Sequence, residues 1–301
     1  MDRRSFLKSG ISGLAGIGFF LDGEPLRAAT EMGPYGSIQE VEPDENGFLL
    51  PEGFKSKVVA VGGDLIKGTD YQWHLFPSGA GTIPDGKNGW FLASNSEVSN
   101  FLTPDETWGG ASSIHFDSNG SVIGAHPILA WSHSNSGGTA TPWGTWLSCE
   151  SDLFNEGKVW ECDPRGVQLP TKLEGIGSRN HGGIAIDPIR KCLYITENHR
   201  EGLFYRYSPS RWPDLVEGSL EAMKLENDRT ISWIEVPNPL DSSILNREKV
   251  SKGKLMPGGR GCWYEKDFVY YELKSRLRVN EKLNFRSLNN LVLFFVSSII
   301  D

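Results

Sequence analysis

The sequence predicts an all-β protein, a β-propeller made of four-stranded antiparallel blades. The first observation is the composition, because 35 Gly, 17 Pro and 10 Trp in 301 residues are typical of short strands joined by tight turns. The second is a predicted strand that recurs along the chain and ends each time in a glutamate. The third is a second strand that follows each copy and closes on a turn. A repeat of about fifty residues made of strands is typical of propeller blades.

The glutamate-ending strands are expected at residues 90–97, 146–150 and 193–198, and the strands that follow them at 113–117, 159–163 and 203–208. Closing turns are expected at 117–120, 163–166 and 208–210, and glycine and proline between residues 134 and 145 predict another tight turn. We expect each glutamate-ending strand to be the innermost of its blade, and Phe268–Glu272 to begin a further inner strand. Equivalent ends of inner strands then meet at one mouth of the central channel.

This arrangement would bring three carboxylates together. Glu97, Glu150 and Glu197 stand 53 and 47 positions apart, so the repeat gives them one register. Three neighbouring carboxylates repel one another unless a cation lies among them or some are protonated. Oxygen ligands favour calcium, magnesium or ferric iron over soft metals. The simpler alternative is that each glutamate ends a hairpin in solvent.

The first thirty residues are typical of an export signal. Arg3 and Arg4 precede Phe6-Leu7-Lys8 at the spacing of a twin-arginine leader, and an apolar run follows at 11–21. That run is too short to span a bilayer, so no membrane span is expected after signal removal. We therefore predict a signal at 1–30, a linker at 31–46, a propeller domain at 47–272 and a periplasmic or secreted protein.

Net charge and cysteine content exclude two further classes. The net charge of −8 argues against a nucleic-acid-binding face, which is basic. The four cysteines contain no C-x-x-C pair, so a zinc ribbon is not predicted and buried free thiols are expected.

Residues 273–301 differ from the rest of the chain. Glycine and proline stop after Gly261, and a basic stretch leads into an apolar one. We interpret this segment as read-through after a frameshift or unspliced segment, with a genuine docking segment as the alternative. The first interpretation predicts a C-terminally truncated propeller that cannot close its ring alone, because a blade without its neighbour leaves strand edges open.

Five segments resemble the PhoX-type alkaline phosphatases; they are Pro51–Phe54, Gly89–Glu97, Thr141–Glu150, Gly157–Pro164 and Tyr194–Glu197. The resemblance covers roughly residues 45–272. It implies a six-bladed propeller, incomplete here, that hydrolyses small phosphate esters outside the cytoplasm with calcium and iron. Asn95, Glu97, Glu150 and Glu197 would then hold the metals. Arg179 and His181 would contact the phosphate or the leaving group.

Three positions depart from the family pattern. Ser136 stands where the family has cysteine, Gly182 where it tends to glutamate, and Arg260 where Glu-Gly commonly precedes a Cys-Trp pair. A serine hydroxyl stays protonated and binds iron poorly, so we expect a weakened iron site and reduced activity. The alternatives are a calcium-dependent propeller hydrolase of lactones or other esters, a non-catalytic propeller with a decayed site, and a fragment that does not fold stably.

Overall fold

The computed structural model describes residues 41–51, 53–99, 109–227, 230–265 and 267–273, together with the strand backbone of three short segments. Two of these, β1 (Phe19–Leu21) and β2 (Glu24–Leu26), pair antiparallel, and the rest of the predicted export signal lies outside the described residues. The chain divides into two compact units, residues 1–59 with 294–301, and residues 60–293.

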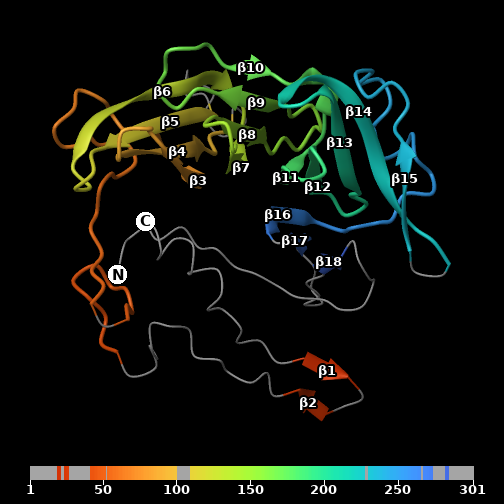
Figure 1. The fold of residues 1–301 in the computed structure, drawn as a ribbon, viewed down its shortest axis with the longest axis horizontal. Coiled ribbons are helices and arrows are strands. Elements are labelled where there is room, and N and C mark those ends of the chain that lie inside the picture. Colours follow the sequence, from red (N-terminus) through yellow and green to blue (C-terminus); the bar gives the residue numbers. More distant parts are fainter. Residues whose placement is uncertain are drawn as a thin grey trace. The chain divides into compact units, whose positions relative to one another are not determined.

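Four antiparallel sheets follow one another in the described part of the second unit (Figure 1). We call them blades 1 to 4. Blade 1 contains β3 (Pro77–Pro84), β4 (Trp90–Ser96), β5 (Gly109–Phe116) and β6 (Val122–Ser132). Blade 2 contains β7 (Asn135–Ala140), β8 (Trp146–Glu150), β9 (Val159–Cys162) and β10 (Thr171–Lys172). Blade 3 contains β11 (His181–Asp187), β12 (Cys192–Glu197), β13 (Phe204–Arg211), β14 (Asp214–Leu225) and β15 (Ile231–Glu235). Blade 4 contains β16 (Gly259–Glu265), β17 (Phe268–Leu273) and β18 (Lys282–Asn284).

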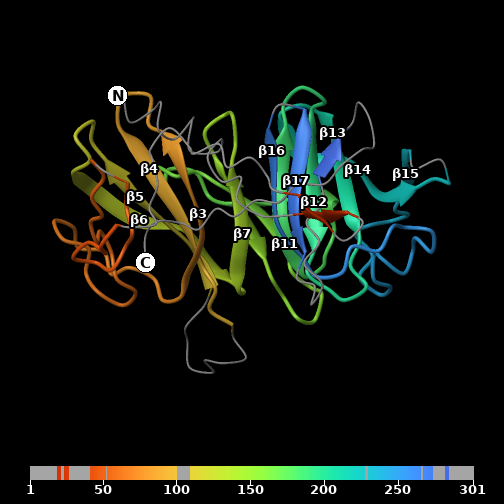
Figure 2. The same ribbon diagram turned by 90° about the horizontal axis from the view of Figure 1, so that it is seen from below.

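The first strand of each blade makes the contact with the next blade. β3 contacts β7, β7 contacts β11, and β11 contacts β16, so these strands lie side by side along the inner side of the array (Figure 2). Within each blade the later strands follow outward in chain order. The predicted all-β fold of antiparallel propeller blades is confirmed. Blades 1 and 2 have the predicted four strands, whereas blade 3 has five and the described part of blade 4 has three.

The prediction of which strand is innermost is wrong. The glutamate-ending strands β4, β8 and β12 are the second strands of their blades, and Phe268–Leu273 is likewise second, after β16. Every residue of β8 and β12 is buried, because these strands have a neighbour on both sides in the sheet and other blades across both faces. The inner strand β7 is mostly half-buried. The sequence therefore marks the most buried strand, which is one place farther from the axis.

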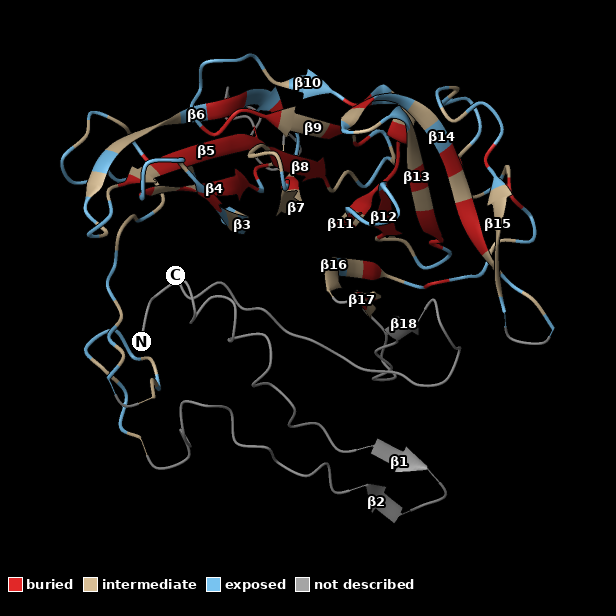
Figure 3. Cartoon of the chain, in the orientation of Figure 1, coloured by how far each residue is buried: buried red, intermediate tan, exposed pale blue. Residues whose placement is uncertain are grey.

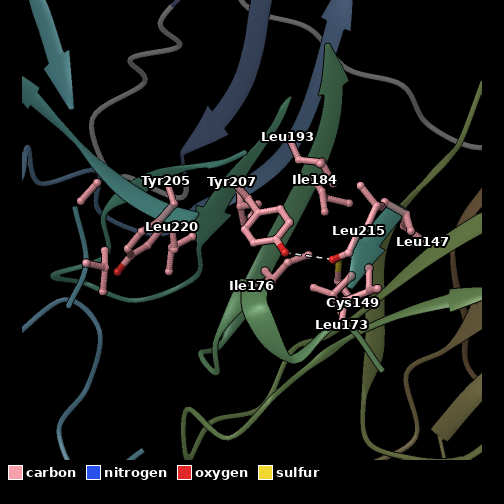
Figure 4. Packing of buried hydrophobic residues seen from close by; sticks show 14 of the residues in the cluster. Leu147, Cys149, Leu173, Ile176, Ile184, Leu193, Tyr205, Tyr207, Leu215 and Leu220 are labelled. Carbon is pink, nitrogen blue, oxygen red and sulfur yellow. Dashed lines mark hydrogen bonds between the residues drawn. The ribbon is translucent and has the colours of Figure 1, made fainter. Parts of the chain in front are cut away.

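Buried hydrophobic clusters lie between neighbouring blades in the described part of the chain, and the one between blades 2 and 3 contains the most residues (Figure 3). Leu147, Cys149 and Val159 of blade 2 belong to the same buried cluster as Ile184 and Leu193 of blade 3. Part of this cluster is drawn in Figure 4, where the hydroxyl of Tyr207 donates to the Leu215 carbonyl at 2.9 Å. That bond supplies a partner for a polar atom that would otherwise be buried at a cost.

Two of the three predicted closing turns are present. The Asp117 carboxylate accepts from the Asn119 and Ser121 amides, and the Asp163 carboxylate accepts from the Arg165 and Gln168 amides. These carboxylates hold their turns by replacing backbone acceptors. The predicted turn at 208–210 is wrong, because β13 continues through these residues to Arg211. The expected turn between 134 and 145 is also shorter, since β7 occupies residues 135–140.

Candidate functional site

The four inner strands carry the same irregularity at the same place. Each one is out of step with its second strand by one residue, between Pro77 and Ala80, Asn135 and Gly138, His181 and Ile184, and Gly259 and Cys262. This is a β-bulge, in which two residues stand opposite one. The bulged pairs are Ser78-Gly79, Ser136-Gly137, Gly182-Gly183 and Arg260-Gly261. Each inner strand therefore bends at the equivalent position of its blade.

The second residue of every bulge is a glycine, and in blades 1 to 3 this glycine touches the bulge of the next blade. A Cβ on Gly79 would lie 2.2 Å from the Ser136 carbonyl oxygen, and one on Gly137 would lie 2.0 Å from the Gly182 carbonyl oxygen. A Cβ on Gly183 would lie 2.7 Å from the Arg260 carbonyl oxygen. Only glycine permits such an approach of two backbones. The four bulges therefore form a continuous ladder along the inner side of the blades.

The first residues of the four bulges occupy one equivalent position. They are Ser78, Ser136, Gly182 and Arg260, and the last three are the positions at which the sequence departs from the family pattern. Ser78 and Ser136 lie next to each other, with their hydroxyl oxygens 3.5 Å apart. Gly182 has no room for a side chain, because a Cβ there would lie 2.2 Å from the Gly259 carbonyl oxygen. This part of the ladder carries hydroxyls, a bare backbone and one guanidinium, and no carboxylate.

Strand pairing corrects the predicted register of the three glutamates. Glu150 pairs with Asn135 and Glu197 pairs with His181, immediately before the bulge in each case. In blade 1 the residue at this place is Ser96, which pairs with Pro77. Glu97 stands one residue beyond. Since side chains alternate between faces along a strand, a shift of one residue separates Glu97 from the environment of the other two.

Glu150 and Glu197 have equivalent roles in their own blades. The Glu150 carboxylate accepts from the Lys158 amide at 2.7 Å and from the Trp160 indole at 3.0 Å. The Glu197 carboxylate accepts from the Leu203 amide at 3.1 Å and from the Tyr205 hydroxyl at 3.0 Å. In both blades these donors lie at the start of the third strand. Each buried carboxylate therefore fixes the following hairpin to the second strand.

Glu197 also forms an ion pair that the sequence does not indicate. Arg247 Nη1 lies 2.6 Å from Glu197 Oε1, and the two side chains are 9% and 1% exposed. Arg247 donates in addition to Asn155 Oδ1 at 3.1 Å. Arg247 lies in the irregular segment between β15 and β16, outside the strand repeat, so no periodic signal marks it. The charge of Glu197 is thus neutralised by a guanidinium.

Asn95 joins blade 1 to blade 2. Its Nδ2 donates to the carbonyls of Ser136 at 3.0 Å and Gly137 at 2.8 Å, which belong to the bulge of β7. Its Oδ1 accepts from the Trp146 indole at 2.9 Å and from the Ser148 hydroxyl at 2.8 Å. A primary amide has two donor hydrogens and one oxygen with two lone pairs, so these four bonds use it completely. Glu97, by contrast, is exposed and accepts from the Ser78 hydroxyl at 3.1 Å.

Arg179 and His181 are buried beside each other with hydrogen-bonding atoms left over. Arg179 is 1% exposed, donates from Nη2 to the Ile176 carbonyl at 2.7 Å and lies over the Tyr205 ring at 3.9 Å. Its Nε and Nη1 have no hydrogen-bond partner, and neither has either ring nitrogen of the fully buried His181, although the backbone of Gly157 and Gly177 lies close to that ring. Burial, and then the positive charge of Arg179, hold the pKa of His181 well below its usual range. The imidazole is therefore neutral at neutral pH.

The predicted metal ligands do not converge. Among the described residues there is no group of three or more His, Cys, Asp or Glu side chains placed to hold a metal ion. Asn95 has no free lone pair, Glu197 is paired with Arg247, and Ser136 offers a hydroxyl in place of a thiolate. In their present contacts these side chains do not form a metal centre, so no step of the chemistry proposed below passes through a metal.

Comparison with known proteins bears on the same region. The family model described as Alkaline phosphatase PhoX matches residues 153–263. The PhoX resemblance is confirmed over this segment. It spans β9 to the middle of β16 and includes Arg179, His181, Glu197 and Arg260. Asn95, Glu97, Ser136 and Glu150 precede it.

The searches of curated proteins and of solved structures give no relative of high sequence identity. No curated protein matches the sequence. Among solved structures, the PQQ-bound form of the aldose sugar dehydrogenase Adh from Streptomyces coelicolor is 12% identical, with a TM-score of 0.31 over 65% of this chain and 75% of that chain.

Proposed function

We propose that the protein binds and hydrolyses small phosphate esters, as its resemblance to the PhoX alkaline phosphatases implies. The observation that carries the proposal is the orphaned pair of Arg179 and His181, which lies inside the segment that matches the family. Buried polar atoms are almost always hydrogen-bonded, and exceptions are found at functional sites. Two unpartnered guanidinium donors beside a neutral imidazole suit a phosphate group.

Arg179 would supply charge and geometry. A phosphoryl group in transit spreads negative charge over its equatorial oxygens, which positive groups neutralise. Nε and Nη1 lie on different edges of the planar guanidinium, so each would donate to a phosphate oxygen separately. Tyr205 and the Ile176 carbonyl, which accepts from Nη2, fix the plane of the guanidinium. Arg179 would therefore orient the ester as well as bind it.

His181 would contact the leaving group. A neutral imidazole carries one N–H and one lone pair, so it can donate a hydrogen bond to the ester oxygen without adding charge. Its pKa is held low, which makes it a hydrogen-bond donor and a poor proton carrier at neutral pH. We therefore propose that His181 positions the leaving oxygen.

Metal dependence and export belong to the same proposal. Calcium is the metal that the resemblance favours, with iron less favoured because Ser136 replaces the family cysteine. Of the four proposed ligands, Glu97 is exposed and could bind a metal as it stands. Asn95, Glu150 and Glu197 would have to give up their present hydrogen-bond or ion-pair partners to do so. The leader at 1–30 supports action outside the cytoplasm. In the part of the chain that the structure describes, no helix is long and apolar enough to cross a membrane.

The test is hydrolysis of p-nitrophenyl phosphate by the full chain, with and without millimolar calcium. Arg179→Lys and His181→Gln should each lower kcat/KM at least about tenfold, which corresponds to about 1.4 kcal/mol. Arg165→Lys is the matched control, because Arg165 lies in an exposed turn. Calcium should raise the melting temperature if it binds the folded chain alone. No hydrolysis in either condition contradicts the enzymatic proposal.

A non-catalytic phosphate-ester binder is the second candidate. The observation that favours it is the ladder of bulges, where Ser136, Gly182 and Arg260 occupy one equivalent position without a carboxylate or a thiolate. Inorganic phosphate should then raise the melting temperature of the wild type and not of Arg179→Lys, while p-nitrophenyl phosphate stays intact. The absence of both a thermal shift and hydrolysis rejects the two candidates together.

A further inference from the structure

An irregular segment, residues 237–249, runs between β15 and β16 (Figure 1) and lies against the stretch that carries Arg179 and His181. A Cβ on Gly177 would lie 2.5 Å from Asn246 Nδ2 and 3.3 Å from Arg179 Nη2, so Gly177 lies close to both side chains. Arg179 is 1% exposed and His181 is 0% exposed. The segment therefore helps to close this pair off from solvent.

The backbone of this segment is hydrogen-bonded only to the segment itself within the described chain. The amides of Asp241, Glu248 and Lys249 donate to carbonyls three or four residues earlier. The Lys249 ammonium donates to the Asn238 and Asp241 carbonyls, which ties the two halves of the segment together. The segment contains no strand or helix, and Asn246 is its one buried residue. Segments with exposed backbone bonds and few buried contacts open at low free energy.

Both ends of the segment are fixed to the blades. The flanking residues Val236 and Val250 belong to the buried cluster between blades 2 and 3. The Val236 amide donates to the Leu220 carbonyl at 2.8 Å, and the Lys254 amide donates to the Met223 carbonyl at 2.7 Å. Both of these carbonyls belong to β14. A loosely held middle therefore lies between two fixed ends.

Arg247 makes the strongest contact between the segment and the blades. Its Nη1 lies 2.6 Å from Glu197 Oε1 and donates to Asn155 Oδ1 at 3.1 Å. A charge-assisted bond such as the one to Glu197 is about twice as strong as a neutral one. The other tie, from Asn246 Nδ2 to the Ser178 carbonyl at 3.4 Å, is long for a hydrogen bond. Arg247 is therefore the residue that holds the segment down.

The same contact joins the segment to the proposed phosphate contacts. Tyr205 donates to Glu197 Oε2 at 3.0 Å, and its ring lies 3.9 Å from the Arg179 guanidinium. The Leu203 amide donates to the same oxygen, so Glu197 keeps two donors if Arg247 leaves. The Arg247 side chain is 9% exposed and Arg179 is 1% exposed. A ligand that arrives from solvent therefore meets the segment before it reaches Arg179.

We propose that residues 237–249 form a lid over the Arg179–His181 site and that Arg247 is the latch of this lid. Lids of this kind admit a ligand and then exclude water from it. A phosphate ester can reach the unpartnered nitrogen atoms of Arg179 and His181 only when the lid is open. The inference rests on the proposed function for the identity of the ligand, whereas the lid and its latch can be measured without one.

The test is hydrogen–deuterium exchange of the full chain, measured by mass spectrometry on peptides from the lid. Asn155 has a φ of 64°, which glycine and aspartate adopt more readily than most residues. Asn155→Gly removes one bond of the latch and should speed lid exchange at least about threefold. Asn155→Asp offers Arg247 a carboxylate in place of an amide oxygen and should slow lid exchange at least about threefold.

The controls separate release of the lid from a general loss of stability. Glu248→Gln is the matched control, because Glu248 is exposed on the lid itself, and it should leave exchange unchanged. Peptides from β12 and β13 should exchange more slowly than the lid and should be unchanged in all three variants. The proposal is overturned if lid exchange changes together with that of β12 and β13, or if the two Asn155 variants shift it in the same direction.

Hydrolysis of p-nitrophenyl phosphate separates the lid from the proposed function. The apparent affinity for a ligand is reduced by the fraction of chains in the closed form, so kcat/KM should be highest in Asn155→Gly and lowest in Asn155→Asp. Hydrolysis that does not follow this order overturns the lid as the gate and leaves the proposed function standing. Exchange in the expected order, with neither hydrolysis nor binding of inorganic phosphate, overturns the proposed function and supports the lid and its latch.

Discussion

Replacement of Asn95 by alanine is expected to weaken the junction between blades 1 and 2. Asn95 is fully buried and its amide makes four hydrogen bonds, all of them to blade 2. Alanine would leave the Trp146 indole N–H and the Ser148 hydroxyl hydrogen without partners, in a region where Trp146 is 1% exposed. Each orphaned buried donor costs about 1–3 kcal/mol, so we expect a loss of about 3–5 kcal/mol in the free energy of unfolding.

The measurement is urea denaturation of the wild type and the variant, followed by circular dichroism and by tryptophan fluorescence. Asn119→Ala is the control, because Asn119 is exposed in the 117–120 turn, and surface changes of this kind usually alter stability by less than about 0.5 kcal/mol. A loss below about 1 kcal/mol for Asn95→Ala would refute the reasoning, since the four bonds could then not be what joins the blades.

Three further predictions concern other contacts of the blades. Glu197→Gln should lower the free energy of unfolding by about 3–5 kcal/mol in the same urea titration, because it leaves the charge of the buried Arg247 unpaired. Glu221→Gln is the control: it removes the partly exposed ion-pair partner of Arg206 and should cost less than about 1 kcal/mol. Gly137→Ala should prevent normal folding or lower the melting temperature by many degrees, since its Cβ would lie 2.0 Å from the Gly182 carbonyl oxygen, whereas Gly124→Ala, with 4.0 Å to its nearest neighbour, should be tolerated. Burial lowers the folded-state pKa of His74 from 6.5 to about 4. The unfolded chain binds more protons between these values, so stability should fall as pH drops through this window, and His74→Gln should flatten that part of the stability profile measured by thermal melts. Each prediction has one outcome that contradicts it. For the glutamates it is an equal loss of stability in Glu197→Gln and Glu221→Gln, and for Gly137→Ala it is a normal melting temperature. For His74→Gln it is an unchanged slope of stability against pH.

The periodic part of the fold was predictable because burial and turn formation leave local marks. Trp146–Glu150 reads as a strand since all five residues are buried, and the 117–120 and 163–166 turns read as turns since an aspartate holds each one. β7 was not predicted, because two glycines in Asn135–Ala140 indicate a turn by composition. Those glycines serve close contacts with Gly182 and Trp146, which lie far away in sequence or in the next strand.

The site was predictable only in part, for a related reason. Spacing along the chain placed Glu97 with Glu150 and Glu197. Strand pairing shows that Ser96, and not Glu97, is equivalent to these two glutamates, and spacing does not reveal this shift of one residue. The hydrogen-bond and ion-pair partners of the candidate ligands also lie outside the repeat or in another blade. Glu197 pairs with Arg247, which is outside the strand repeat, and Asn95 donates to a carbonyl of blade 2. Arg179 and His181 were singled out from sequence, but their unpartnered nitrogen atoms are a property of the folded chain.

The close approach at Gly182 has a consequence for any attempt to rebuild the metal centre of the family in this scaffold. Ser136→Cys adds almost no volume, so the cysteine that the resemblance leads us to expect at this position can be introduced by a single change. A glutamate at residue 182 would need its first side-chain carbon where the Gly259 carbonyl and the Thr196 hydroxyl already are, at 2.2 Å and 2.6 Å. A side chain at residue 182 would therefore require β16 to move away from β11.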